Sequence, residues 1–155
     1  MGTSFTIKTV LNLFPTDETC LEEIKKLRFP QGIRCVDCEE VTKHYKLQNR
    51  NAYACEYCRH QVYPLKGTIF EKSTTPLQIW FFSLFLMTIT HGKISAKALQ
   101  RETYVTYKTA WRMRQNILHL MKQNHGDLLK GPDDTISVSF FNAFELKITH
   151  RQEVS

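Results

Sequence analysis

Apolar and polar positions alternate with helical spacing first in residues 17–28, where Leu21 and Ile24 fall on one face. Thr16 or Asp17 has a side chain suited to capping this helix, and Pro30 follows the last residue that fits the pattern. Residues 1–32 are therefore predicted to hold an N-terminal helix and a lead-in to the next region.

The pattern then changes to short runs of β-forming residues between residues 33 and 72. A polar turn at residues 49–51 separates the two middle runs. These runs are too short to bury a core, so a further element must hold them together. The predicted strands cover residues 33–35, 44–47, 53–55 and 61–63.

Residues 77–87 are apolar in nearly every direction around a helix, and Gly92 follows shortly after. A capping box of Thr75 and Gln78, with Pro76 at the first helical position, is predicted to begin this helix. A helix that is apolar on all sides usually lies at the buried centre of a bundle. The helix is expected to end near residue 90.

Two further helices are predicted at residues 95–102, capped by Ser95, and at residues 106–123. The three-residue turn between them, residues 103–105, gives the pair the lengths of a helix-turn-helix. The last helix has an apolar stripe and a basic face at helical spacing. The apolar stripe consists of Ala110, Met113, Ile117 and Met121. The basic face consists of Lys108, Arg112, Gln115, His119 and Lys122.

Composition agrees with a folded protein that has an anionic partner. The chain has 155 residues, 42% of them hydrophobic, and a net charge of +6. The charge is uneven, because residues 73–125 contain seven Lys and Arg but only one acidic residue, Glu102. Such an excess favours nucleic acid or an acidic membrane surface. The longest apolar stretch is much shorter than a membrane span, and the N-terminus lacks the pattern of a signal peptide.

The cysteines carry the most specific signal in the sequence. Cys35 and Cys38 form one C-x2-C pair, Cys55 and Cys58 form another, and sixteen residues separate the pairs. This spacing is typical of a structural Zn²⁺ site with four thiolate ligands. A chance match, a redox pair or bound iron are the alternatives. His44 and His60 flank the pairs and are interpreted as surface residues, because four sulfurs already complete the shell.

Two further residues are interpreted as structural. Cys20, the fifth cysteine, falls on the apolar face of the first helix and is expected to be a small core residue. Trp111, in the last helix, is expected to anchor the core and not to stack on a base.

The last helix is the candidate DNA-reading element, since the N-terminal part of a recognition helix reaches base edges in the major groove. A plain three-helix bundle with a solvated basic face is the alternative. The candidate contacts on the last helix are Thr106, Tyr107, Lys108, Thr109, Arg112 and Gln115. Lys93, Lys97 and Arg101 are candidates for contacts with the phosphate backbone.

The sequence resembles the N-terminal region of bacterial insertion-sequence transposases of the DDE type. The resemblance covers about residues 14–125 and is carried by the two cysteine pairs and three segments. These segments are residues 16–32, 67–88 and 107–113. The family opens with a short helix and a zinc ribbon, continues into a helix-turn-helix and ends in a nuclease domain. The resemblance implies that the front part binds the ends of a mobile element.

The resemblance stops where the family places its first catalytic aspartate. Ser139 stands near that position, and Asp133 and Asp134 are interpreted as loop charges. A DDE site needs three carboxylates to hold two metal ions, and residues 126–155 are too few for such a domain. They are expected to be a truncated tail, the remnant start of a nuclease domain, so no catalytic activity is expected.

These observations together predict a small α+β protein with four parts. They are an N-terminal helix (1–32), a β zinc ribbon (33–72), a three-helix helix-turn-helix bundle (73–125) and a short β-like tail (126–155). The predicted function is binding of double-stranded DNA at element ends, in the cytoplasm at the nucleoid, with structural Zn²⁺. No membrane or small-molecule partner is expected. The alternative is a protein-interaction module that self-associates or inhibits an intact transposase, motivated by the apolar run 140–144.

Overall fold

The computed structural model describes residues 7–125 and shows a small mixed fold of helices and antiparallel sheets. The helices are α1 (Ile7–Leu13), α2 (Asp17–Arg28), α3 (Leu77–Ile89), α4 (Ala96–Thr103) and α5 (Tyr107–His125). The strands are β1 (Arg34–Cys35), β2 (Glu40–Val41), β3 (His44–Lys46), β4 (Tyr53–Cys55) and β5 (Gln61–Val62). The predicted α+β class is confirmed; α1 and β2 were not predicted.

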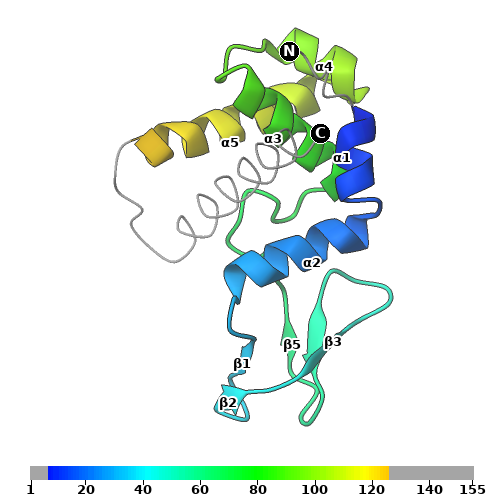
Figure 1. Cartoon of the computed structure of the whole chain (residues 1–155), viewed down its shortest axis with the longest axis vertical. Coiled ribbons are helices and arrows are strands. Elements are labelled where there is room, and N and C mark those ends of the chain that lie inside the picture. Colours follow the sequence, from blue (N-terminus) through cyan, green and yellow to red (C-terminus); the bar gives the residue numbers. More distant parts are fainter. Residues whose placement is uncertain (1–6, 126–155) are drawn as a thin grey trace, which may run out of the picture.

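The molecule is elongated, with the strands at one end and α4 and α5 at the other (Figure 1). Helix α2 lies across the strands, and α3 packs against each of the other four helices. This central position explains why α3 is apolar on all sides, as its sequence predicted. Within the described part of the chain, α3 thus links the helices next to the strands with α4 and α5.

The strands form two small antiparallel sheets. One joins β1 to β2, and the other has the order β3-β4-β5. In the second sheet His44 pairs with Cys55 and Tyr53 pairs with Val62. Each strand has only two or three residues, so backbone pairing alone cannot stabilise these sheets.

Helix α2 begins and ends where the sequence predicts. The Thr16 side chain accepts a hydrogen bond from the Thr19 backbone N–H at 3.1 Å, and the Thr19 side chain accepts one from the Thr16 backbone N–H. Cys20, Leu21 and Ile24 are buried on its inner face. Burial raises the pKa of the Cys20 thiol to about 12, so this cysteine is a neutral core residue, as expected.

The start of α3 differs from the predicted capping box. The helix begins at Leu77, and the carbonyl of Pro76 accepts bonds from the first turn. The Gln78 backbone N–H donates to the Asp17 carboxylate at 3.1 Å, while the Gln78 side-chain amide donates to the Phe14 carbonyl at 2.9 Å. Asp17, the first residue of α2, and Phe14, which lies between α1 and α2, therefore bind the first turn of α3 and fix these helices to one another.

A polar contact ties the ribbon sheet to α2. The Tyr53 hydroxyl donates a 2.7 Å hydrogen bond to the Glu22 carboxylate, and the Lys25 ammonium lies 4.6 Å from the centre of the Tyr53 ring. Tyr53 is only 2% exposed, and burial together with the Glu22 carboxylate raises the pKa of its hydroxyl. Because Tyr53 and Cys55 belong to the same strand, this contact holds a cysteine-bearing strand under α2.

Candidate functional site

The four predicted cysteine ligands meet at one point of the ribbon. The sulfurs of Cys35, Cys38, Cys55 and Cys58 all lie within 4.8 Å of one another. The Cys35 and Cys58 sulfurs are 3.3 Å apart, and the Cys38 and Cys55 sulfurs are 3.9 Å apart. Sulfurs at the corners of a tetrahedral Zn²⁺ site, each about 2.3 Å from the metal, are about 3.8 Å apart. The cluster has the size that a structural zinc ion requires.

The two cysteine pairs sit in turns with the same backbone geometry. The Glu39 N–H donates to the Cys35 carbonyl at 2.9 Å, and the Arg59 N–H donates to the Cys55 carbonyl at 3.0 Å. Glu39 and Arg59 both adopt left-handed backbone angles, with φ of 58° and 66°. Each strained turn aims two sulfurs at the same point, and a metal bound there compensates the strain.

Local hydrogen-bond donors stabilise one cysteine as a thiolate. The Cys58 backbone N–H and the Thr42 hydroxyl, 3.1 Å from the Cys55 sulfur, lower the pKa of Cys55 to about 6. Hydrogen bonding to Cys58 raises the pKa of Cys38 to about 12. The Cys38 thiol therefore keeps its proton until a bound cation displaces it.

Neither flanking histidine belongs to the cysteine cluster among the described residues. The Nδ1 atom of His44 lies 2.9 Å from the Thr42 carbonyl oxygen. The Nδ1 atom of His60 lies 3.2 Å from a carboxylate oxygen of Asp37. Each histidine has a partner at Nδ1 outside the cluster, so the four sulfurs form the candidate shell without them. His44 is half-buried and not the surface residue that was expected, and within the described part of the chain its buried Nε2 has no hydrogen-bond partner.

The second part of the site is the pair α4 and α5. Ser95 caps α4 by accepting a hydrogen bond from the Ala98 N–H at 3.1 Å. Tyr104 ends α4 in the left-handed conformation, and α5 begins three residues later. The Thr106 hydroxyl accepts from the Thr109 N–H at 3.2 Å and donates to the Thr109 hydroxyl. The helix, short turn and helix lie as the sequence predicted.

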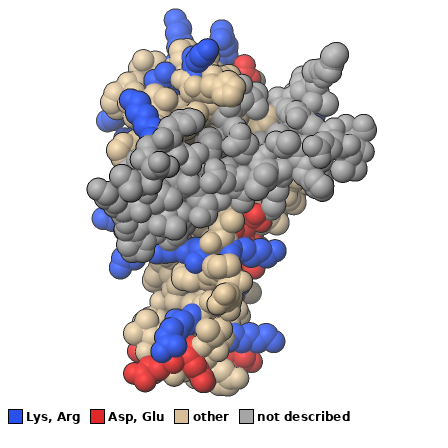
Figure 2. Space-filling view, turned by 60° about the vertical axis from the view of Figure 1, so that its left-hand side comes forward, with Lys and Arg blue, Asp and Glu red and all other residues tan. Residues whose placement is uncertain are grey.

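Most residues predicted for DNA contact lie on the outside of this helix pair, whereas Thr109 is half-buried. Lys93, Lys97, Arg101, Lys108, Arg112 and Gln115 are exposed. Ala110, Met113 and Ile117 are buried on the opposite side of α5. Figure 2 shows Lys and Arg side chains gathered over this end, whereas Asp and Glu side chains accompany them at the ribbon end.

Two residues of α5 depart from the expected pattern. Trp111 is 51% exposed and does not anchor the core, because a step of one residue turns it about 100° away from the buried Ala110. Arg114 is half-buried, and its Nε donates to the Ile94 carbonyl at 2.6 Å. Arg114 therefore fixes α5 to the segment after α3, and the exposed basic face is formed by the other cations.

Comparison with known proteins supports the ribbon assignment. Residues 15–61 match the family model of the transposase zinc-ribbon domain. The predicted resemblance is confirmed for this region. The region is similar to a transposase zinc ribbon, and its four close cysteines are suited to structural zinc.

A longer similarity extends past the ribbon. The chain is 26% identical over 113 residues to a protein described as an uncharacterized protein in transposable element ISH50, from Halobacterium salinarum. The match covers 72% of this chain and 38% of that relative, so the chain spans well under half of the relative's length. No solved structure matches the chain.

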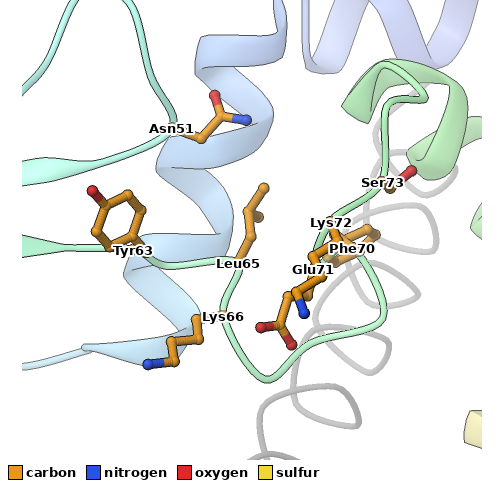
Figure 3. A pocket seen from close by; sticks show the side chains of 8 residues that line it. All are labelled: Asn51, Tyr63, Leu65, Lys66, Phe70, Glu71, Lys72 and Ser73. Carbon is orange, nitrogen blue, oxygen red and sulfur yellow. The ribbon is translucent and has the colours of Figure 1, made fainter.

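A cavity of about 360 Å³ that the sequence did not predict lies between the ribbon and the segment leading to α3 (Figure 3). Lys66, Lys72 and Glu71 contribute charges of both signs to its lining. The Glu71 carboxylate already accepts a hydrogen bond from the Gly67 N–H at 3.1 Å. The cavity has no concentration of one charge and no cluster of metal-ligating groups among the described residues.

The positions that bear on nuclease chemistry lie outside the described residues. These are Asp133, Asp134 and Ser139, and the apolar run 140–144 lies there too. In the described part of the chain, no helix is both long and apolar enough to cross a membrane.

Proposed function

We propose that the chain binds double-stranded DNA through α4 and α5, as the targeting part of a transposase. One observation carries the proposal: the exposed side of the helix pair is cationic. Lys97 and Arg101 on α4 face solvent together with Lys108 and Arg112 on α5. Glu102 is the one acidic residue in the described segment 73–125. A surface of this kind is attracted to phosphates.

The zinc ribbon has a supporting role in this proposal. Four thiolates around one Zn²⁺ carry a net charge of −2, which offsets the surplus of Lys and Arg over Asp and Glu in residues 34–72. The ribbon is therefore a weak source of attraction for DNA compared with the helical end. The Tyr53–Glu22 hydrogen bond connects the ribbon to α2.

The finer part of the proposal concerns the target. The similarity to a transposase zinc ribbon and to a protein of a transposable element supports binding at the ends of a mobile element. A protein with this function acts at the chromosome, in the cytoplasm of its cell. Binding is the role proposed for the described residues, since their metal site is closed and leaves no position for substrate.

The test is a titration of the full chain against a fluorescent duplex carrying the ends of the neighbouring element, over a series of salt concentrations. We expect tighter binding to the element ends than to a shuffled duplex, with log affinity falling linearly as log salt rises. Equal affinity for both duplexes at physiological salt would contradict targeting. Absence of any salt-dependent binding would contradict the DNA-binding function as a whole.

The alternative function is assembly of the chain with itself or with an intact transposase. The sequence feature that suggests it, the apolar run 140–144, lies outside the described residues. Light scattering of the metal-loaded chain alone tests it. A strict monomer that binds element-end DNA favours the targeting function over assembly.

A further inference from the structure

Three aromatic side chains are exposed along the turn and first helical turns of the proposed DNA-binding surface. Tyr104 is 90% exposed, Tyr107 is 52% exposed and Trp111 is 51% exposed. We call these three residues the aromatic strip. Tyr107 and Trp111 are four residues apart on α5, so they lie on the same face of the helix.

The backbone under the first of these residues is strained. Tyr104 has a φ of 60°, a left-handed angle that favours glycine, and this costs a non-glycine residue about 1 kcal/mol. The strain is not offset by packing, because most of the Tyr104 side chain lies in solvent. The left-handed angle itself belongs to the C-cap of α4, where the Tyr104 N–H donates to the Gln100 carbonyl at 2.8 Å. The nearly complete exposure of the ring has no such structural reason and points to a contact with a partner.

The charge around the strip favours nucleic acid as the partner. Lys108 and Arg112 are exposed and follow Tyr107 and Trp111 directly along α5. On a helix wheel with 100° per residue, Trp111 lies between Tyr107 and Gln115, and Gln115 lies next to Lys108. Tyr107, Trp111 and the basic face form one continuous exposed surface of α5, and Tyr104 precedes it in the turn.

In the major groove, the apolar group on a base edge that an aromatic ring can contact is the 5-methyl group of thymine. Gln115 is exposed one turn after Trp111, and a glutamine amide can bond to both N6 and N7 of adenine. We propose that Tyr107, Trp111 and Gln115 read T·A base pairs, with the rings against thymine methyl groups and the amide on adenine. The inference rests on the proposed function, and it assigns that function a base preference.

The experiment uses the full, zinc-loaded chain and three short duplexes that differ only in their central pairs. One duplex has A·T pairs, the second has deoxyuridine in place of every thymine, and the third has G·C pairs. We expect the wild type to bind the thymine duplex about fourfold more tightly than the uracil duplex for each methyl group that is removed from water. The G·C duplex should bind less tightly than the thymine duplex, because it offers no methyl group and no adenine edge.

The variant Trp111→Ala should lose the part of the preference for thymine over uracil that its ring provides, about fourfold, while keeping salt-dependent binding and the contribution of Tyr107. Tyr45→Ala is the matched control, because Tyr45 is a similarly exposed aromatic residue, 47% exposed, on the ribbon. This control variant should retain the full preference. A wild type that binds the thymine and uracil duplexes equally would overturn the inference and leave the proposed function standing. The absence of salt-dependent binding to any duplex would instead overturn the proposed function.

Tryptophan fluorescence gives a second readout that needs no variant. The chain has two tryptophans, and Trp80 is only 2% exposed, so iodide quenching reports mainly on Trp111. The thymine duplex should protect Trp111 from iodide more than the G·C duplex does at equal occupancy. Unchanged quenching in the bound state would contradict the inference. If Trp111→Ala instead dissociates an oligomer and leaves the base preference intact, the strip is a protein interface and the inference is wrong.

Discussion

The ribbon and the helical end are stabilised by different forces, although they belong to one small chain. In the ribbon, each strand has two or three residues, and Val36, Val41 and Tyr57 are largely exposed. In the helical part, large side chains such as Trp80, Phe81 and Phe85 are almost completely buried around α3. Ile33 and Tyr53 of the ribbon join the main core, but the strands beyond them depend on the metal, whereas the helices depend on apolar burial.

Charge divides the same two regions. The ribbon combines basic and acidic side chains with a metal centre that would itself be negative. The helical end presents Lys and Arg side chains with few acidic side chains among them (Figure 2). The difference indicates that one region provides a stable framework and the other provides attraction to DNA. Substitutions in the ribbon should accordingly affect metal content and stability, whereas substitutions of exposed cations at the helical end should affect DNA affinity.

Loss of the metal should have the largest effect. Zinc binding contributes on the order of 10 kcal/mol to folding in such sites, so Cys35→Ser should unfold the ribbon. Cys20→Ser changes a cysteine outside the cluster and is the matched control for metal content. Metal analysis and thermal melting are the measurements. A Cys35→Ser protein that melts like the wild type and retains one zinc per chain would refute the zinc assignment.

Acidification should release the metal, as Cys35→Ser does, because protons compete with Zn²⁺ for the thiolates. The pKa of Cys38 without metal is about 12, so this thiol is protonated whenever the ion leaves at neutral or acidic pH. Occupancy should therefore be complete at neutral pH and fall as the pH decreases. Zinc release followed with a chromogenic chelator measures it, and occupancy that rises on acidification would contradict thiolate ligation.

Deletion of a core side chain should have the next largest effect, and it should affect the helices first. Phe81 is 0% exposed and lies 4.7 Å from Phe14, ring centre to ring centre. Phe81→Ala should lower the free energy of unfolding by about 3–5 kcal/mol, while zinc remains bound below the melting temperature. Leu11→Ala, at a residue that is 37% exposed, is the milder control. Loss of zinc from folded Phe81→Ala would show that the two regions are not separable.

Removing one exposed cation from the helical end should weaken DNA binding without loss of stability. Arg112→Ala should cost about 1–3 kcal/mol of binding free energy if the guanidinium contacts a guanine, and less if it contacts phosphate. Arg34→Ala makes the same charge change on the ribbon, where Arg34 is also exposed. We expect Arg34→Ala to have the smaller effect on the dissociation constant. Equal effects of the two substitutions would remove the distinction between the regions.

The smallest predicted effect concerns the joint between the two regions. Tyr53→Phe removes the hydrogen bond to Glu22 and should destabilise the protein by about 1 kcal/mol. Burial opposes ionisation of Glu22, but Tyr53 and Lys25 outweigh it and lower the pKa of Glu22 from 4.5. The stabilisation should thus be present above pH 4.5 and lost as the pH falls through the lowered pKa. Denaturant unfolding of both proteins with excess zinc measures the difference, and a gap that widens on acidification would contradict this linkage.

The sequence predicts those features that depend on local patterns. Thr16, Ser95 and Gly92 mark helix ends, and the cysteine spacing defines the metal centre, because each of these signals acts within a few residues. Helix α1 escaped prediction because no acidic residue lies in its first turn and no basic residue in its last. Strand β2 has two exposed residues, so no alternation of burial reveals it.

The features that the sequence did not predict depend on tertiary contacts. The start of α3 is capped by Asp17, sixty-one residues away in sequence, so no local pattern reveals it. The exposure of Trp111 depends on which face of α5 packs on α3 and α4. Trp111 lies at the edge of the apolar stripe, where the sequence pattern is compatible with either a buried or an exposed ring. The DNA contacts and the division into domains stay predictions.

The most direct test of this account is X-ray absorption at the zinc edge, measured on the purified full chain. We predict one zinc per chain with four sulfur neighbours at about 2.3 Å and no nitrogen or oxygen neighbour. A shell that contains a nitrogen or oxygen ligand, or a folded protein without bound metal, would contradict it.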